Sequence, residues 1–339
     1  MNPRKLSNPP NPWQSNHVEW LGEPPDAGLK VYEETARSIL SENQSPDLPF
    51  TYGLNPYRGC FHGCIYCYAR PTHQYLDFGA GSDFERRIVV KTNAADLLQK
   101  RLDGGRWEPE TIVFSGVTDC YQPLEASYEL TRACLQICAD RRNPVGIVTK
   151  GSLIRRDAGL LGEMAQWNGV RVFVSIPYAD DDTGWAIEPQ AAAISQRFRT
   201  IEVLSDAGVD VGVSLAPMIP GLSDSDIPAI LERAADAGAK RAFMQLLRLP
   251  KPVDRIFEQR LREVMPERAD RIFSAIEDLR DGQRNDSRFG HRMVGRGPRW
   301  EAIAGLFRST CRRLGLASNR DEPLNRDEFR PGGQQMLGL

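Results

Sequence analysis

Short apolar runs alternate with longer amphipathic stretches between about residue 85 and residue 250. Several of the apolar runs have the length and composition of strands: 112–116, 145–150, 170–176, 209–215 and 241–247. One more strand is expected in the segment TYGLNPYRG, residues 51–59. The stretches between the runs, such as AADLLQKRL, repeat their apolar residues at helical spacing. Nearly continuous apolar strands that alternate with helices predict a parallel sheet buried on both faces.

The number of strands and their spacing predict the fold class. Six strands in this alternation favour an α/β fold, a partial (β/α)6 TIM-like barrel with its chemistry at the carboxyl ends of the strands. An open doubly wound sheet is the alternative, because strand spacing does not report closure.

Composition divides the chain into three regions. Residues 1–50 are rich in Pro, Asn and Ser, and they are expected to form an irregular N-terminal arm with one short helix near 30–41. Residues 51–250 hold the predicted barrel, and residues 251–339 are expected to form a helical and basic C-terminal extension.

The overall composition is that of an ordinary globular protein. Hydrophobic residues make up 41% of the chain and charged residues 26%. No apolar run approaches the 18 residues that a membrane span needs, and the polar, proline-rich N-terminus lacks the apolar core of a secretory signal. We therefore expect a cytoplasmic protein with no membrane partner. The net charge of −2 argues against a uniformly basic nucleic-acid coat but leaves room for a local basic patch.

Three of the seven cysteines lie within eight residues, in the segment CFHGCIYC at 60–67. Thiolates are preferred ligands of iron–sulfur clusters, and three ligands for four irons leave one iron open to a small molecule. Zinc is an alternative, with His62, His73 or a remote cysteine as the fourth ligand. The other alternative is that the three cysteines bind no metal and have only a structural role. His62 and His73 are otherwise expected to contact solvent or substrate.

The loop from Gly59 to Cys67 resembles the signature of the radical S-adenosylmethionine (radical SAM) superfamily, C-x3-C-x-aromatic-C, with Tyr66 at the aromatic position. The resemblance implies a [4Fe–4S] cluster whose ligands are Cys60, Cys64 and Cys67. It also implies that S-adenosylmethionine binds the open iron through its amino and carboxylate groups. An electron from a donor such as flavodoxin or ferredoxin would then cleave it to a 5′-deoxyadenosyl radical, which takes hydrogen from a substrate.

Other segments resemble the spore photoproduct lyase-like branch of that superfamily: residues 55–60, 118–125, 148–150 and 199–208. This resemblance implies that polar residues at the strand ends contact S-adenosylmethionine, namely Ser115, Thr118, Lys150 and Ser175. Tyr66 is expected to form a wall for the adenine. Asp119 is expected either to contact the cofactor or to act as a helix N-cap, and Lys150 could instead be an ordinary solvated lysine.

The chain departs from that branch at the hydrogen-atom donor. Spore photoproduct lyases use a cysteine close to the polar residues of the second strand, and Gly116 stands at that position here. Cys120, a few residues further on, is an alternative donor and the one catalytic residue that we predict. Its other reading is a small buried hydrophobe.

The segment Arg284–Arg313 holds eight arginines and two acids, Asp286 and Glu301. Such a segment could bind the phosphates of a nucleic acid, or it could be a solvated face paired with the acidic helices before it. Three functions follow: a radical enzyme acting on nucleic acid or a nucleotide, a radical enzyme acting on a peptide or small metabolite, and a non-catalytic iron–sulfur or zinc protein that senses redox state or binds nucleic acid.

Overall fold

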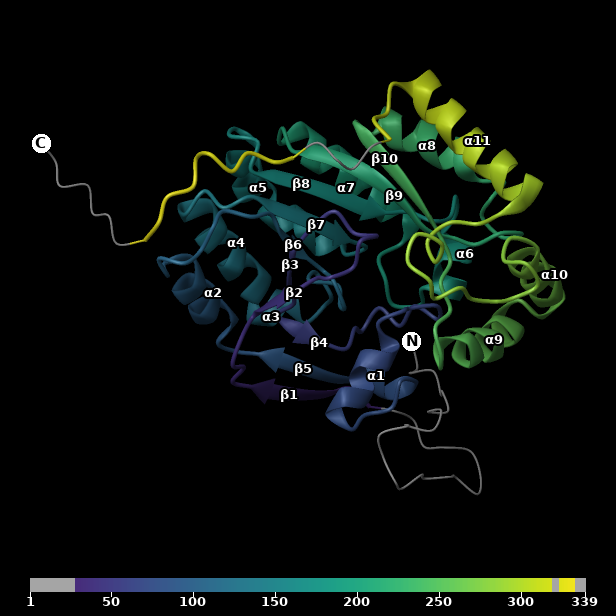
Figure 1. Cartoon of the computed structure of the whole chain (residues 1–339), viewed down its shortest axis with the longest axis horizontal. Helices are drawn as coiled ribbons and strands as arrows, with labels where there is room; N and C mark the ends of the chain where they lie inside the picture. The colour runs from purple at the N-terminus through teal and green to yellow at the C-terminus, as the bar shows by residue number, and fades with distance from the viewer. Residues whose placement is uncertain (1–27, 319–322, 333–339) are drawn as a thin grey trace, which may run out of the picture.

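The centre of the molecule is a seven-stranded sheet with the strand order β10-β9-β8-β7-β6-β3-β2 (Figure 1). The structure is a computed structural model, and it describes residues 28–318 and 323–332. The strands of this sheet are β2 Leu40–Glu42, β3 Tyr52–Leu54, β6 Ile112–Phe114, β7 Val145–Thr149, β8 Val170–Ser175, β9 Asp210–Met218 and β10 Arg241–Leu246.

The predicted α/β fold is confirmed. Every neighbouring pair from β3 to β10 is parallel, and only β2 runs antiparallel to its neighbour. The parallel strands follow one another in chain order without the reversal that marks a doubly wound sheet. Because β2 and β10 end the sheet and do not pair with each other, the barrel is partial and open.

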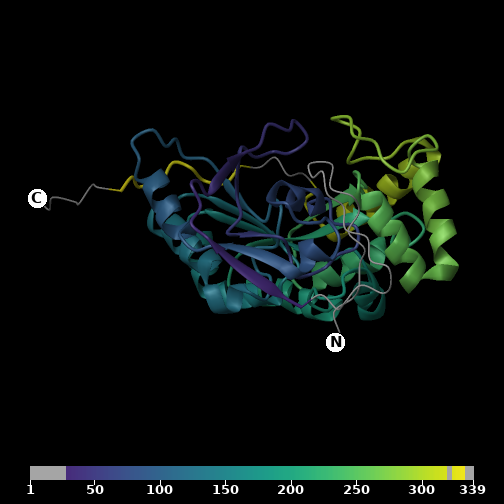
Figure 2. The same ribbon diagram turned by 90° about the horizontal axis from the view of Figure 1, so that it is seen from below.

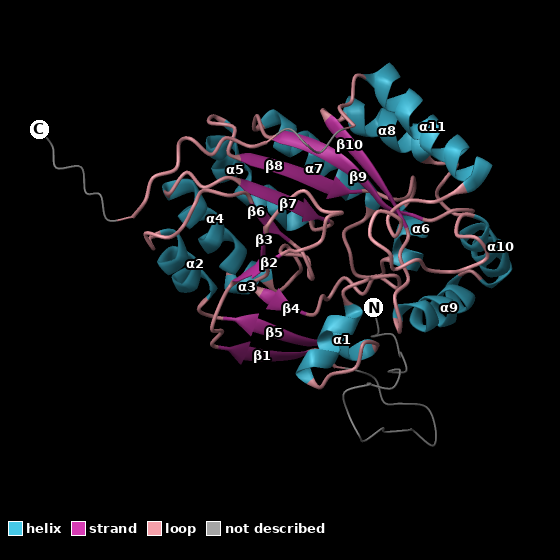
Figure 3. Ribbon diagram, in the orientation of Figure 1, coloured by secondary structure: helices cyan, strands magenta, loops and turns pink. Residues whose placement is uncertain are grey.

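Helices connect the strands and cover one side of the sheet, as Figures 2 and 3 show. The α-helices are α1 Ser82–Arg86, α2 Ala94–Leu102, α3 Glu125–Tyr128, α4 Leu130–Asp140, α5 Ala158–Ala165, α6 Asp181–Ile187, α7 Ile194–Asp206, α8 Ile227–Asp236, α9 Val253–Val264, α10 Pro266–Asp278 and α11 Gly297–Leu314. Two 3-10 helices, η1 Arg70–Leu76 and η2 Ser152–Asp157, complete the set. Among the described residues no helix is both long and apolar enough to cross a membrane.

The helix expected near residues 30–41 is wrong, because this part of the arm forms two strands instead. β1 Lys30–Glu34 pairs in parallel with β5 Arg87–Lys91 in a second sheet of order β1-β5-β4, and β2 lies on the edge of the main sheet. Val31 and Tyr32 favour a strand once a partner strand is available. The partner lies more than fifty residues away in sequence, so local spacing does not reveal it.

The strand expected at residues 51–59 is divided in two. β3 ends at Leu54, and β4 Tyr57–Arg58 turns into the second sheet and pairs with β5. Pro56 lies at the break, and since proline has no backbone N–H, it cannot continue a paired strand. The change of sheet brings the chain from the first barrel strand to Cys60 within six residues.

The two ends of the open sheet are joined by loops. The loop between β2 and β3 contains Asp47, which accepts a hydrogen bond from Gly290 N (2.6 Å) and pairs with Arg292. Gly290 and Arg292 belong to the loop between α10 and α11, and that loop is bound to β10 because Leu246 N donates to Met293 O (3.1 Å). A polar seam therefore spans the gap between the sheet edges.

Candidate active site

The cysteine loop begins at a glycine that the local backbone requires. Gly59 has φ +78°, and a Cβ there would lie 2.8 Å from Phe84 O. The next residue is fixed by a hydrogen bond from Cys60 N to Phe84 O (2.9 Å), and Cys67 N donates to Cys64 O (3.3 Å). The backbone of the loop is thus bound to the surrounding protein, and its three cysteines are brought to one place.

The thiols of the loop are free and largely shielded from solvent. Cys60 and Cys64 are buried, Cys67 is partly buried, and none forms a disulfide. Burial, together with the neighbouring Asp119 and Cys67, raises the pKa of Cys60 to about 12. The pKa of Cys67 is also raised by burial. Three such thiols need a positively charged partner to remain ionised together.

Backbone N–H groups point toward the sulfur atoms. The N–H groups of Asp119 and His62 interact with the sulfur of Cys60, and that of Ala69 with the sulfur of Cys67; each lowers the thiol pKa. Hydrogen bonds to the sulfurs are a usual feature of iron–sulfur sites. Three close thiols with N–H donors therefore fit an iron–sulfur cluster. Among the described residues, no group of three His, Cys, Asp or Glu side chains could hold a single metal ion.

Arg70, which no sequence motif marks, binds the backbone carbonyls of the loop. Its side chain is completely buried. It donates to Cys64 O from Nη2 (2.8 Å) and Nε (3.1 Å), to Gly63 O from Nη2 (3.2 Å), and it pairs with Glu85. Its Nη1 donates to Ala80 O (3.2 Å) and Gly81 O (3.0 Å). A guanidinium presents its donors in a fixed fork, so this residue fixes the loop's shape.

Thr118 and Gln122 hold the loop from the side of β6. Thr118 Oγ1 donates to Gly59 O (2.6 Å), and Gln122 Oε1 accepts from Phe61 N (3.0 Å). Gln122 Nε2 also donates to Thr118 Oγ1 (3.1 Å). The hydroxyl of Thr118, which we predicted to contact S-adenosylmethionine, is thus bound to the cysteine loop, and the predicted cofactor contact stays a prediction.

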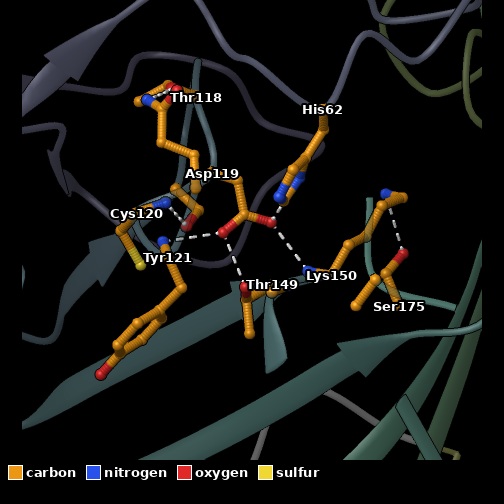
Figure 4. Close-up of polar contacts among 12 residues, drawn as sticks. His62, Thr118, Asp119, Cys120, Tyr121, Thr149, Lys150 and Ser175 are labelled. Atoms are coloured by element: carbon orange, nitrogen blue, oxygen red, sulfur yellow. Dashed lines mark hydrogen bonds and ion pairs between the residues drawn. The ribbon is translucent and has the colours of Figure 1, made fainter. Parts of the chain in front are cut away.

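Asp119 ties the end of β6 to the end of β7 (Figure 4). Its Oδ1 accepts from Tyr121 N (2.9 Å) and Thr149 Oγ1 (2.6 Å), and its Oδ2 accepts from Lys150 N (2.7 Å). His62 Nδ1 lies 3.4 Å from Oδ2. The helix N-cap reading is wrong, because α3 begins at Glu125 with another residue as its N-cap. Asp119 caps a turn of its own and cross-links two strand ends.

Lys150, Ser175 and Tyr66 meet at the carboxyl ends of β7 and β8. Lys150 Nζ donates to Ser175 Oγ (3.2 Å) and lies 5.9 Å from the centre of the Tyr66 ring. Burial by itself lowers the pKa of Lys150, but nearby Glu188 and Cys64 outweigh it, and the pKa is raised. A charged lysine, a hydroxyl and an aromatic ring therefore lie together beside the cysteine loop.

Glu188 and Arg197 complete this group, and no sequence motif marks either residue. Glu188 is completely buried; it accepts a hydrogen bond from Tyr66 and lies 2.5 Å from Arg197 Nη1. Tyr66 and Glu188 are 122 residues apart. No local motif marks Glu188 among the chain's many acids, because its role depends on residues brought together by the barrel.

A family model described as the radical SAM superfamily matches residues 54–234, which is more than half of the chain. The chain belongs to the radical SAM superfamily. This radical SAM protein is therefore an enzyme, and the expectation of a non-catalytic sensing protein is set aside. The matched segment holds the cysteine loop, the strand ends around Lys150 and Ser175, and the buried Glu188.

Relatives of this radical SAM enzyme are uncharacterized proteins. Rv2578c of Mycobacterium tuberculosis (strain H37Rv) is 40% identical over 217 residues, which cover 62% of this chain and 63% of the relative. MJ0683 of Methanocaldococcus jannaschii is 30% identical over 196 residues, covering 58% of this chain and 70% of the relative. The match thus spans less than two thirds of the mycobacterial protein.

Spore photoproduct lyase has a similar fold. Its structure in complex with a dinucleoside spore photoproduct aligns with a TM-score of 0.62 and 17% sequence identity, covering 85% of this chain and 81% of that chain. The open radical SAM barrel and its flanking elements therefore share the architecture of that enzyme.

Two further predicted residues of the radical SAM enzyme lie in the turn after β6. Ser115 has φ +77°, a region that a non-glycine residue rarely occupies, and its Oγ accepts a hydrogen bond from Cys120 N (3.0 Å). Cys120 has no exposed surface and lies in the main hydrophobic core. This matches the reading as a small buried hydrophobe, and the role of Cys120 as a hydrogen-atom donor stays a prediction.

His73 is expected to contact solvent or substrate, and contact with solvent is excluded because its side chain has no exposed surface. His73 is completely buried, and its ring lies against Phe78 and Phe84 with its Nε2 2.8 Å from Arg87 O. Burial lowers its pKa to about 4. His62 is also buried, and it lies beside Asp119 at the strand ends.

Most arginines of the segment Arg284–Arg313 are paired with acids. Their ion pairs join Arg284 to Glu258 and Glu277, Arg288 to Asp286, Arg292 to Asp47, Arg296 to Asp281, Arg299 to Asp224 and Arg313 to Glu232. Pairing with the helices before the segment was the alternative reading of the sequence. It reduces the positive charge that this surface offers to phosphates.

Proposed function

We propose that this radical SAM enzyme holds a [4Fe–4S] cluster on Cys60, Cys64 and Cys67 and binds S-adenosylmethionine at the neighbouring strand ends. The observation that carries the proposal is the meeting of three thiols, two buried and one partly buried, with Lys150 and Tyr66, whose ring lies 5.9 Å from the lysine Nζ. The thiols suit a cluster with one open iron. The ammonium and the ring suit the carboxylate and the purine of the cofactor.

The chemistry divides between cofactors and protein in the usual way. When bound, the cluster and S-adenosylmethionine supply a radical by one-electron cleavage of the sulfonium, and this radical takes hydrogen from the substrate. Lys150 offers a fixed positive charge for a carboxylate, and Ser175 orients Lys150 through a hydrogen bond. Asp119 keeps the ends of β6 and β7 together. The buried loop keeps water away from the thiols. In this proposal residues 51–250 carry the catalysis.

The substrate and the electron donor belong to the proposal as well. We take a flavodoxin or ferredoxin as the reductant. Nucleic acid or a nucleotide is the first candidate substrate, supported by the fold shared with spore photoproduct lyase. A peptide or small metabolite is the second, supported by Gly116 at the position of the donor cysteine and by the ion pairs of the arginine segment.

The test of the radical chemistry is production of 5′-deoxyadenosine. The protein is reconstituted with iron and sulfide without oxygen, reduced with dithionite and given S-adenosylmethionine. We expect 5′-deoxyadenosine from the wild type and none from Cys60→Ala, Cys64→Ala or Cys67→Ala. Cys134→Ala is the control, because Cys134 is also a buried free cysteine but lies in α4. A fully loaded protein that yields no cleavage product would contradict the proposal.

The nucleic-acid candidate is tested by binding at low salt. Arg308 and Arg312 are exposed on α11 and have no ion pair among the residues that the structure describes. Changing both to Ala should weaken affinity for single-stranded DNA and reduce the salt dependence by about one counterion per lost phosphate contact. Arg284→Ala, which removes an arginine already paired with two glutamates, is the control. Absence of any binding at low salt would favour the small-substrate candidate.

A further inference from the structure

Glu188 lies where the cysteine loop meets the ends of β7 and β8. It follows α6 directly, and its side chain has no exposed surface. Its carboxylate accepts a hydrogen bond from the Tyr66 hydroxyl. Arg197 Nη1 is 2.5 Å from Oε2, and Lys150 Nζ is 3.9 Å from Oε1. A carboxylate that has lost all its water keeps its charge only with such partners.

The backbone around Glu188 binds the same loop. Ile65 N donates to Ile187 O (3.1 Å), and Gln190 N donates to His62 O (3.1 Å). Together with the Tyr66 hydroxyl, these contacts join residues 187–190 to the middle of the cysteine loop. Glu188 is therefore fixed to the part of the loop that lies between the cysteines.

On its other side Glu188 faces two cations that share one serine. Lys150 Nζ donates to Ser175 Oγ (3.2 Å), and Arg197 Nη1 donates to Ser175 O (3.0 Å). Two positive charges this close repel each other in a dry interior. The charge of Glu188 offsets that repulsion and limits the rotamers of the long lysine side chain.

We propose that Glu188 is a positioning residue that couples the cysteine loop to Lys150, so that the S-adenosylmethionine site keeps one geometry relative to the loop. The inference rests on the proposed function, because it assigns Lys150 to that site. It goes beyond that function because it names the residue that aligns the cysteine loop with Lys150. Removing the carboxylate charge should therefore change cofactor affinity without removing any thiol ligand.

The first variant is Glu188→Gln in the full chain, because glutamine keeps the size of the side chain and still accepts a hydrogen bond from Tyr66. Its matched control is Glu125→Gln. Glu125 is also completely buried, accepts a hydrogen bond from a tyrosine hydroxyl, that of Tyr57 (2.5 Å), and pairs with an arginine, Arg156 (2.9 Å). The partners of Glu125 lie outside the group around Lys150. The Glu125→Gln variant therefore shows how much stability is lost when a buried charge is removed away from that group.

Three quantities are measured on the reconstituted proteins: iron per chain, the midpoint of thermal unfolding, and the dissociation constant of S-adenosylmethionine. We expect Glu188→Gln to keep the iron content of the wild type and to raise the dissociation constant at least tenfold. Glu125→Gln should lower the midpoint of unfolding and leave the dissociation constant within twofold of the wild-type value. An unchanged dissociation constant in Glu188→Gln, or an equal increase in Glu125→Gln, overturns the inference.

Tyr66→Phe is the second variant, and it tests the same coupling if Glu188→Gln does not fold. It removes only the hydroxyl that binds Glu188 and keeps the ring. We expect it to raise the dissociation constant with iron retained, and its effect should not add fully to that of Glu188→Gln. Full additivity, or no effect, overturns the coupling. A wild-type protein that carries iron but does not bind S-adenosylmethionine defeats the proposed function first, which separates the two failures.

Discussion

Replacement of Arg70 by lysine tests how the cysteine loop is held. Arg70 makes six hydrogen bonds: five to the backbone carbonyls of Gly63, Cys64, Ala80 and Gly81, and one to Glu85. An ammonium group has three donors, so Arg70→Lys keeps the charge opposite Glu85 but loses at least three of the six bonds. Hydrogen bonds from charged donors contribute about 1.5–3 kcal/mol each. The expected loss of stability is therefore about 5 kcal/mol.

The assay combines thermal unfolding with iron analysis. A loss of that size lowers the midpoint of unfolding by roughly 10 °C, and we expect less than half of the wild-type iron after identical reconstitution. Arg171→Lys is the control. Arg171 is also buried and pairs with Asp210 (2.8 Å), but it lies at the amino ends of the strands, so its variant should retain iron. A midpoint of Arg70→Lys within 2 °C of the wild type, with full iron, would refute the reasoning.

Three other predictions concern pH, backbone strain and the seam. The folded pKa of His73 is about 4, below the ordinary value, so the unfolded chain takes up the proton first and stability falls as pH decreases from about 6.5 toward 4. The free energy of unfolding, measured with urea, should differ between pH 7.5 and pH 5 by about 2 kcal/mol less in His73→Gln than in the wild type. An equal difference in the two proteins would contradict this prediction. Gly59→Ala should lower the free energy of unfolding by at least about 2 kcal/mol in the same assay, because of the positive φ of residue 59 and the approach of its Cβ to Phe84 O. A variant as stable as the wild type would show that the turn relaxes freely. Asp47→Asn should speed hydrogen exchange at the Gly290 amide about tenfold by weakening the contacts to Gly290 and Arg292, and unchanged exchange would show that the seam holds without that charge.

The parallel strands and the cysteine loop could be predicted because both are local patterns. Each barrel strand is a short apolar run, and the three cysteines lie within eight residues. Short sequence segments are also enough to identify the aromatic residue before the third cysteine and the polar residues at the strand ends. Tyr66, Lys150 and Ser175 were named in this way, and the structure brings them together.

The residues that were missed act through contacts between distant parts of the chain. Glu188 is defined by Tyr66, 122 residues earlier, and Arg70 looks like any surface arginine until its carbonyl partners are seen. Local spacing predicts a helix near residues 30–41, whereas residues 30–34 form a strand with β5, a partner that lies far along the chain. Counting charges left two readings of the arginine segment open, because the acids that pair with it lie elsewhere: Arg284 pairs with acids on α9 and α10, and Arg292 pairs with Asp47 in the β2–β3 loop.

The seam between Asp47 and the loop at Gly290 has a consequence for the order of folding. Its partners are 243 residues apart, so the contact has to wait until the chain has been synthesised as far as Gly290. Closing so long a loop is entropically unfavourable, although the cost grows only slowly with length, and contacts of large sequence separation slow folding. Until then the nascent sheet exposes the edge of β9 or β10, and an unpaired edge invites association with other chains. The loop between α10 and α11 and then Ala317 both hydrogen-bond to β10, so this edge is covered in two steps as these residues are added.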